Sequence, residues 1–592
     1  MKKQFGLPLM LASALAFSAC SSDDVAENCN GSLTDFTNGG YVKMAINMPT
    51  VKSSEGAFKG VNDDYRDGTP DEYAVNNTTV IMFQGNNEND AIFHSAYNIT
   101  DTWNPALTPN GQISSILKLT KKVNEPAIGS NLYALVVVNN NGLLSVGPDH
   151  KLTVGSDDFT GNFTDFKNKL ATATSVSGTD FSGAGLFMAN APLSKGTGGT
   201  AKSDGPVTTL VNLTSDVYPT ATAAEAKPAA HIYIERGVAK VTFVRPKTDA
   251  SFTTDAFSNG KGVATVTYTM DGWNLDITNK SSFLVRHVNP DWNAYKTDIT
   301  GVTVTNPFRF VGHTEVHDGL YRTYWAEDPN YNSTPAGAFN TVTSVDDINK
   351  PFGEYNPLYC LENTFNVDNQ NQDATTRAIV RVKVKIDGVA GDFYTVNGGK
   401  TTLYSKDNLD NLVKNAIITN SAVVAANDGH APIATAINLS YSTPDANNVQ
   451  TVDGIVLTLG DGTLLSSKTN YNDILSAVNA AVKNITKYVG GYVYYPVRIK
   501  HFGDELTPWA QAYDANITTG KIYPATNKEQ RYLGRYGVVR NNWYELEVNK
   551  IKGIGYAVIP PSNKVPDDVL DQYISVKINI LSWAKRSQSE EL

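Results

Sequence analysis

The chain ends in a regular alternation of apolar and polar residues, a pattern that suits an extended strand. Within Tyr573–Trp583 aliphatic and polar residues alternate, so one face of the segment is apolar and the other is polar. A strand at the very end of a chain can pair within its own sheet, or it can leave and complete the sheet of another chain. The pattern alone favours permanent membership of its own sheet. The aliphatic residues are Ile574, Val576, Ile578 and Ile580.

A second alternation of the same kind lies near the start, in Tyr41–Pro49, and predicts another strand. The segment that follows, as far as Pro70, is rich in Gly, Ser, Asp and Asn and shows no periodicity. We therefore expect an exposed loop that is open to proteases. The apolar face of the strand comprises Val42, Met44, Ile46 and Met48, and the basic residues of the loop include Lys52, Lys59 and Arg66.

Length and composition indicate a β-rich protein with more than one domain. A chain of 592 residues is too long for a single core. It is rich in Thr, Asn, Val, Gly and Tyr, and only 18% of its residues are charged, which favours strands and turns over helices. A net charge of -10 argues against nucleic acid as a partner, because phosphate binding depends on an excess of Lys and Arg.

The N-terminus predicts export as a lipoprotein. Two lysines follow Met1, Leu7–Phe17 is apolar, and small residues then precede Cys20. This resembles a bacterial lipoprotein signal, although Phe17 stands where Leu is more usual. We expect a signal peptide over residues 1–19 and lipidation of Cys20, with ordinary signal cleavage nearby as the alternative. No later apolar run is long enough to span a bilayer, so the lipid is the expected membrane attachment.

Three cysteines are too few for a disulfide scaffold or a metal cluster. If Cys20 is acylated, Cys29 lies in the leader and Cys360 in the body of the chain. We expect Cys360 to be a buried free thiol. A bridge between Cys29 and Cys360 is the alternative.

The body of the chain shows further β patterns and little helix. Leu132–Val138 and Arg377–Ile386 predict strands, whereas Pro219–Ala230 predicts a linker. Helical spacing of apolar residues predicts one clear helix over Asn472–Tyr488, and Asp157–Thr172 has room for a short one.

No stretch makes a convincing catalytic or cofactor site. Gly196–Ser203 is close to a phosphate-binding loop, but Ala201 replaces a required glycine and the residues after it break any helix. His313 and His317 are better explained as surface histidines than as a metal pair. We therefore expect no enzyme, no metal and no cofactor. Neighbouring carboxylates, which glycoside hydrolysis uses in pairs across a cleft, are expected to be solvated: Asp63 and Asp64, Asp346 and Asp347, Asp504 and Glu505.

Several stretches together resemble a known family. They resemble, in order along the chain, the C-terminal domain of the Mfa-type (minor fimbrium subunit) fimbrillins of Bacteroidales, which are type V pilins. The N-terminal part matches more loosely. The matching stretches are Trp273–Lys280, Tyr321–Tyr331, Tyr359–Phe365, Tyr494–Phe502, Arg535–Leu546 and Ile551–Gly555.

The resemblance implies an all-β fold of two transthyretin-like β-sandwich (Greek-key) domains with few short helices. It places a leader with a removable first strand over residues 20–66. An N-terminal β domain then covers residues 67–230. A C-terminal β domain covers residues 231–592 and ends in a donor strand, 573–583.

The resemblance also implies a function. A fimbrillin crosses the envelope as a lipoprotein, anchored by lipid in the outer membrane. A trypsin-like protease then cuts behind the first strand, and the C-terminal strand of a neighbouring subunit fills the vacated groove. Lys52, Lys59 and Arg66 are the candidate cut points; the family usually cuts after an Arg close behind the strand, whereas here the nearest basic residue is Lys52. The expected partners are other copies of the chain and accessory pilins, in an extracellular fimbrium that supports adhesion or biofilm formation.

The alternative is a monomeric surface lipoprotein that binds glycan or host protein through exposed aromatic residues. Trp325, Tyr331 and Trp509 are the candidates, although core packing is the more common role of such side chains. A complete C-terminal strand favours a shaft subunit over a tip subunit, because a tip subunit does not need to donate.

Overall fold

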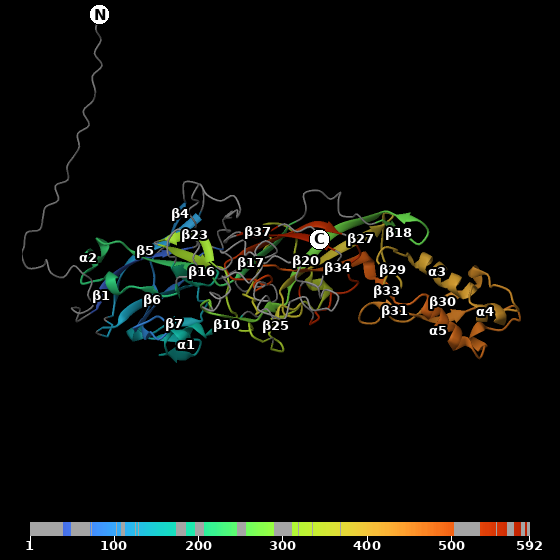
Figure 1. Ribbon diagram of the computed structural model, residues 1–592, viewed down its shortest axis with the longest axis horizontal. Helices are drawn as coiled ribbons and strands as arrows, with labels where there is room; N and C mark the ends of the chain where they lie inside the picture. Colours follow the sequence, from blue (N-terminus) through green and yellow to red (C-terminus); the bar gives the residue numbers. More distant parts are fainter. Residues whose placement is uncertain are drawn as a thin grey trace, which may run out of the picture.

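The computed structural model describes residues 39–48, residue 72 and most of 74–588. The larger interior gaps are 108–112, 173–184, 196–205, 245–255, 289–310, 503–532 and 568–573. The described residues form an elongated molecule with a large β-sheet at one end, a β-sandwich in the middle and a small helical lobe at the other end (Figure 1). The expected all-β fold with few short helices is confirmed. In the described part of the chain, no helix has the length and apolar character needed to cross a membrane.

In the described part of the chain, the N-terminal sheet has ten strands. Its apolar face forms a core with side chains from many of them, among them Met44, Met82, Leu119 and Val136. In sheet order the strands are β3 (Ile92–Ile99), β2 (Thr78–Gly85), β6 (Asn131–Val138), β11 (Met188–Asn190), β16 (Ala230–Arg236), β1 (Gly40–Asn47), β5 (Ile113–Val123) and β4 (Asn104–Leu107), with β14 (Val211–Asn212) beside β6 and β15 (Val217–Tyr218) beside β1.

This sheet curls until its two ends meet. The backbone N–H of Asn124, just after β5, donates to the hydroxyl of Tyr97 in β3 at 2.8 Å. The indole of Trp103, just before β4, donates to the hydroxyl of Thr78 in β2 at 3.0 Å. Strands at opposite ends of the sheet order are therefore neighbours in space, and the apolar face is enclosed.

The outer face of β2 and β6 is covered by local structure. Phe83 packs edge-on against Phe163 and Phe166 of α1 (Phe163–Lys167), which fulfils the expectation of a short helix in this region. Three short strands complete the cover: β7 (Leu144–Val146), β8 (Leu152–Val154) and β9 (Asp157–Phe159).

The middle of the molecule is a sandwich of two sheets. Phe243 and Leu546 of one sheet share a core with Trp273 and Val380 of the other. The first sheet runs β26 (Leu358–Cys360), β17 (Ala239–Val244), β35 (Trp543–Ile551), β36 (Ile574–Leu581) and β37 (Arg586–Gln588). The second contains β20 (Val266–Asp276), β27 (Arg377–Ile386), β28 (Val389–Ala390) and β34 (Tyr492–Arg498).

Small sheets join the two large parts. β16 and β17 are separated only by Gly237 and Val238, so one ribbon runs from the N-terminal sheet into the sandwich. The expected boundary at 230/231 falls inside β16, which belongs to the N-terminal sheet. The joining sheets are β12 (Leu193–Lys195), β13 (Val207–Thr208), β23 (Val311–His317) and β24 (Leu320–Thr323); β10 (Leu170–Thr172) and β22 (Ser281–Phe283); β21 (Thr278–Asn279) and β25 (Phe339–Asn340); and, on the sandwich, β18 (Phe257–Ser258) and β19 (Val263–Ala264).

The helical lobe differs from expectation. The helix predicted over Asn472–Tyr488 ends at Ala481, because Asn484 adopts a positive φ of 51° and the next four residues form a strand. The longer helix over Lys406–Ile418, whose N-terminus is capped by Ser405, was not predicted from the sequence. The lobe contains α3 (Lys406–Ile418), α4 (Ser421–Ala426), α5 (Tyr471–Ala481), β29 (Phe393–Thr395), β30 (Asn438–Tyr441), β31 (Val449–Gln450), β32 (Val452–Val456) and β33 (Ile485–Tyr488).

The structure also tests two other predictions from the sequence. Pro219–Ala230 is not a bare linker, because it contains α2 (Ala221–Glu225), whose N-terminus is capped by the side chain of Thr220. Cys360 is a buried free thiol, as expected, and the alternative bridge to Cys29 is wrong. Burial raises the pKa of the Cys360 thiol to about 12, so it stays protonated and unreactive at neutral pH.

Candidate strand-exchange site

The first strand, β1, is an inner strand of the N-terminal sheet. It runs antiparallel to β5 over its whole length and parallel to β16 from Met44 to Asn47. Its first half pairs with β15, where Tyr41 faces Tyr218. Removal of β1 would therefore leave unpaired backbone edges on both sides of a single slot.

The inward face of β1 is fully buried, as the alternation in Tyr41–Pro49 predicts. Val42, Met44 and Ile46 are 0% exposed and Met48 is 1% exposed. At about 1.5–3 kcal/mol for each buried side chain, these four contribute on the order of 6–12 kcal/mol to holding the strand in place. Whatever occupies the slot must supply a comparable apolar face.

The outward face of β1 is held by α2. The ammonium of Lys43 donates to the carbonyl oxygens of Glu225 at 2.7 Å and Lys227 at 3.0 Å. These carbonyls lie at the C-terminal end of α2, where a helix leaves carbonyls without intrahelical partners. Ala45, the next outward residue, is 0% exposed. The segment from β15 through α2 to β16 thus forms one side of the slot that β1 occupies. For this reason the prediction of a linker over Pro219–Ala230 was wrong.

The lipidation and cleavage candidates cannot be placed. Cys20, Lys52, Lys59 and Arg66 lie outside the described residues, and their roles stay predictions. After Met48 the next described residue is Glu72.

Glu72 is fixed at the junction between the N-terminal sheet and the sandwich. Its buried carboxylate lies 2.7 Å from the ammonium of Lys240 in β17 and accepts a hydrogen bond from the Tyr359 hydroxyl. Its carbonyl accepts a hydrogen bond from Arg236. Burial lowers the pKa of Lys240, and the charge of Glu72 opposes this shift. The chain downstream of the expected cleavage loop is therefore held independently of β1.

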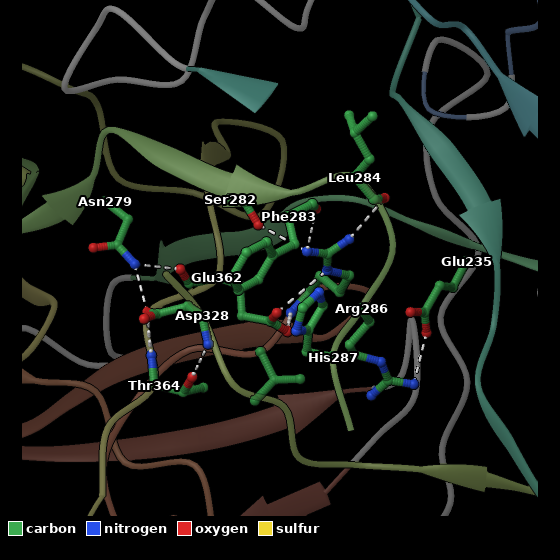
Figure 2. A network of polar contacts seen from close by, with 12 residues as sticks. Glu235, Asn279, Ser282, Phe283, Leu284, Arg286, His287, Asp328, Glu362 and Thr364 are labelled. Carbon is green, nitrogen blue, oxygen red and sulfur yellow. Dashed lines mark hydrogen bonds and ion pairs between the residues drawn. The ribbon is translucent and has the colours of Figure 1, made fainter. Parts of the chain in front are cut away.

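The far end of β16 is fixed by a buried polar network, which Figure 2 shows from close by. Glu235 pairs with Arg286 at 2.9 Å, and Arg286 also donates to the carbonyl of Thr323 at 2.7 Å. Burial raises the pKa of Glu235, while the guanidinium of Arg286 opposes this shift. A strand of the slot is in this way tied to the middle of the molecule.

On the sandwich side of this network, Arg540 contacts several buried polar groups. Its guanidinium lies 3.4 Å from the Glu362 carboxylate and donates to the Ser282 hydroxyl at 2.7 Å and the Phe283 carbonyl at 2.8 Å. The side chains of Arg540 and Glu362 are 2% and 0% exposed. A buried pair of this kind depends on both partners, because either charge alone would be left uncompensated.

Two titratable groups of the network shift in opposite directions. Burial raises the pKa of Asp328 to about 7, against the effect of hydrogen bonds from the backbone N–H groups of Thr364 and Asn330. Burial lowers the pKa of His287 to about 4; its ring stacks on Phe283, and its Nε2–H donates to the carbonyl of Lys167 at 3.0 Å.

These shifts predict opposite pH dependences. Between pH 4 and 7 the folded protein binds more protons at Asp328 than the unfolded chain does, so the stability from this group falls as pH rises. His287 stays neutral when folded, so its contribution instead falls as pH drops from 6.5 to 4.

We expect Asp328→Asn to be more destabilising, relative to the parent protein, at pH 4.5 than at pH 7.5, by on the order of 3 kcal/mol. His287→Gln should show the opposite trend. Urea unfolding at the two pH values measures both, and parallel pH profiles for the two variants would contradict the assignment.

The C-terminal strand, β36, is seated in its own sheet. It pairs antiparallel with β35, from Trp543 opposite Leu581 to Ile551 opposite Ile574, and with the short β37 on its other side. The donor candidates Ile574, Val576, Ile578 and Ile580 all lie in this strand. β1 and β36 thus both lie in sheets of their own chain, and their exchange between chains stays a prediction.

Among the described residues, the other candidates are not gathered into a site. His313 and His317 lie on β23, Asp346 and Asp347 are exposed, and no group of three or more His, Cys, Asp or Glu suited to a metal occurs among the described residues. The Gly196–Ser203 loop, Asp63, Asp64, Asp504, Glu505 and Trp509 lie outside the described residues.

Two of the three aromatic residues proposed for a binding surface are core residues. Trp325 and Tyr331 are 3% and 8% exposed and pack with Phe502, Leu533 and Val539. The structure therefore corrects the interpretation of these two side chains as exposed contacts for a glycan or host protein.

Comparison with known proteins concerns mainly the C-terminal region. Residues 486–589 match the family model for the C-terminal part of the major fimbrial subunit protein type IV, fimbrillin. The search of curated proteins gave no match.

The solved structures that match this chain do so at low identity and low TM-score. They include a candidate cell adhesion protein from Parabacteroides distasonis (10% identity, 93% of this chain and 99% of that chain, TM-score 0.34). A second candidate cell adhesion protein is from Bacteroides eggerthii (12%, 93% and 98%, 0.31). The tip fimbrial protein Mfa3 from Porphyromonas gingivalis, with a C-terminal truncation, is a third (10%, 92% and 100%, 0.28). Identities and TM-scores of this size carry no argument about function.

The family match covers β34, β35, β36 and β37, the strands that include the expected donor. It confirms, for this region, the resemblance to fimbrillins found in the sequence. Residues 486–589 of this chain are therefore similar to the C-terminal part of a fimbrillin, a major fimbrial subunit protein.

Proposed function

We propose that this protein is a pilus subunit that polymerises by strand exchange, with adhesion or biofilm formation as the outcome. It is exported as a lipoprotein acylated at Cys20 and held at the outer membrane. A trypsin-like protease cuts after Lys52, Lys59 or Arg66, and β1 leaves its slot. The C-terminal strand of another copy, or of an accessory pilin, then fills the slot.

The observation that carries this proposal is the inner position of β1. Its loss would open two strand edges and an apolar floor at once, and an open slot of this kind binds an added strand through main-chain hydrogen bonds and alternate side chains. β36 offers four aliphatic residues in the same period-two arrangement. Cleavage gives the exchange a direction, because a β1 segment that is no longer tethered can diffuse away.

The contacts of Glu72 support the same order of events. Since Glu72 is held by Lys240 and Tyr359, a cut anywhere in 52–66 frees β1 while the new N-terminus stays attached to the sandwich. The cut therefore separates β1 from the slot without unfolding the rest of the chain.

We expect limited trypsin treatment of the purified precursor to give a new N-terminus at residue 53, 60 or 67 and to produce polymers that resist SDS. N-terminal mass spectrometry and gel electrophoresis measure the two results. A precursor with Lys52→Gln, Lys59→Gln and Arg66→Gln should remain uncut in this region and monomeric.

A chain that lacks residues 573–592 is the matched control for donation. It should be trimmed at the same site and stay folded, but it should not extend a polymer. If the trimmed full-length protein stays monomeric, the strand-exchange proposal is wrong and a monomeric surface protein is favoured.

A further inference from the structure

The contact between Lys43 and α2 marks one position of the slot. On the outward face of β1, Tyr41 and Lys43 are half-buried, whereas Ala45 is fully buried. The Lys43 ammonium bridges the carbonyl oxygens of Glu225 and Lys227. The slot thus has one place on this face that is built to receive an ammonium group, next to a place that has room only for a small side chain.

The C-terminal strand contains the same local pattern as β1. In β1 the sequence Val42-Lys43-Met44-Ala45-Ile46 alternates around one lysine, and in β36 Val576-Lys577-Ile578-Asn579-Ile580 does the same. Each strand carries a single lysine, which lies between two aliphatic residues of the apolar face.

We propose that in the polymer Lys577 of the incoming copy takes the place of Lys43 on the carbonyl oxygens of Glu225 and Lys227, and that this contact sets the register of the exchanged strand. This inference rests on the strand-exchange function proposed above. It names the residue that selects one register among those that the apolar alternation alone would allow.

Registers shifted by one or two residues are less favourable than the proposed one. A shift by one residue would turn the apolar face of the donor outward. A shift by two residues in one sense would place Lys577 where Ala45 is 0% exposed, and would bury an ammonium group without a partner.

A shift by two residues in the other sense would bring a polar residue to the place of Ile46, which is 0% exposed. That residue is Ser582 or Gln572, according to the direction of the strand. In the register with Lys577 at the place of Lys43, the polar substitution falls instead at Met48, beyond the end of β1. In this register the place of Ala45 receives Ser575 if the incoming strand runs opposite to β1, or Asn579 if it runs the same way, and the smaller Ser575 suits that place better.

A disulfide trap tests the register directly. Lys118 of β5 lies opposite Ala45. In trimmed protein that carries Lys118→Cys, residue 575 or 579 of the donor, depending on strand direction, should lie opposite the new cysteine, at a separation suited to a disulfide. We expect intermolecular disulfides with Ser575→Cys or Asn579→Cys, and none with Tyr573→Cys or Leu581→Cys, which would face residue 118 only in a register shifted by two residues. A disulfide with Tyr573→Cys or Leu581→Cys would overturn the proposal.

Loss of the ammonium gives a second readout. Lys577→Met should slow polymerisation of the trimmed subunit by about tenfold, because hydrogen bonds that involve a charged group are lost. Lys585→Met, outside the alternating segment, should leave the rate unchanged. Equal rates for Lys577→Met and the parent protein would overturn the role of Lys577. If the parent protein itself forms no polymer, the failure lies in the strand-exchange function and not in the register.

Discussion

A precursor in which β1 is stapled into its slot should be cut by protease but should not polymerise. Ala45 of β1 and Lys118 of β5 lie directly opposite each other in the antiparallel pair. Ala45→Cys with Lys118→Cys places two cysteines at a cross-strand distance that a disulfide can bridge. Because the slot cannot empty, we expect the yield of SDS-resistant polymer to fall by on the order of a hundredfold, a loss that a disulfide constraint of this strength can produce.

The staple is reversible, which supplies its control. Reducing agent added after trypsin should restore polymerisation to the level of the parent protein, whereas each single cysteine variant should polymerise normally with or without it. Serine in place of Cys29 removes the competing thiol upstream. If the oxidised, trimmed double variant polymerised at the parent rate, β1 would not be the strand that leaves.

The second large effect concerns the buried network that holds β16. Arg540→Met should lower the free energy of unfolding by about 3–5 kcal/mol, because the carboxylate of Glu362 would stay buried without its partner. The same change also removes donors to the Ser282 hydroxyl and the Phe283 carbonyl. Urea unfolding of the full-length chain measures the loss.

Two further variants separate charge burial from general damage. Arg540→Met combined with Glu362→Gln should be more stable than Arg540→Met alone, because no unpaired charge then remains. Arg381→Met breaks a more exposed pair with Asp271, in which the side chains are 19% and 31% exposed, and should cost about 1 kcal/mol or less. A loss of similar size for Arg381→Met and Arg540→Met would show that burial of the network is not what stabilises this junction.

The parts of the fold that depend on neighbours in the sequence could be predicted. β1, β6 and β27 lie where alternation or a continuous apolar run places them, and the inward residues of β1 are those that the period-two pattern selects. Helices were harder to predict. α3 carries its stripe of Leu409, Val413 and Ile417 behind a Ser405 cap, a signal that was present in the sequence but was diluted by many polar residues.

The candidate site depended more on contacts between distant segments. No local pattern reveals that Lys43 reaches the carbonyls of Glu225 and Lys227, about 180 residues away. Glu72 and Lys240, and likewise Glu362 and Arg540, pair across similar separations. α2 has only five residues, and its structural role comes from its packing on β1. Its sequence alone therefore had the appearance of a linker.

The alternation of side chains alone determined that this protein has a β fold, that β1 has one apolar face, and that the segment of β36 carries a matching one. Only the tertiary structure decided that β1 is an inner strand between β16 and β5, with α2 over its polar face. The physical reason is that the face of a strand is set by the geometry of successive residues. Its neighbours are chosen by the burial and hydrogen bonding of the whole sheet.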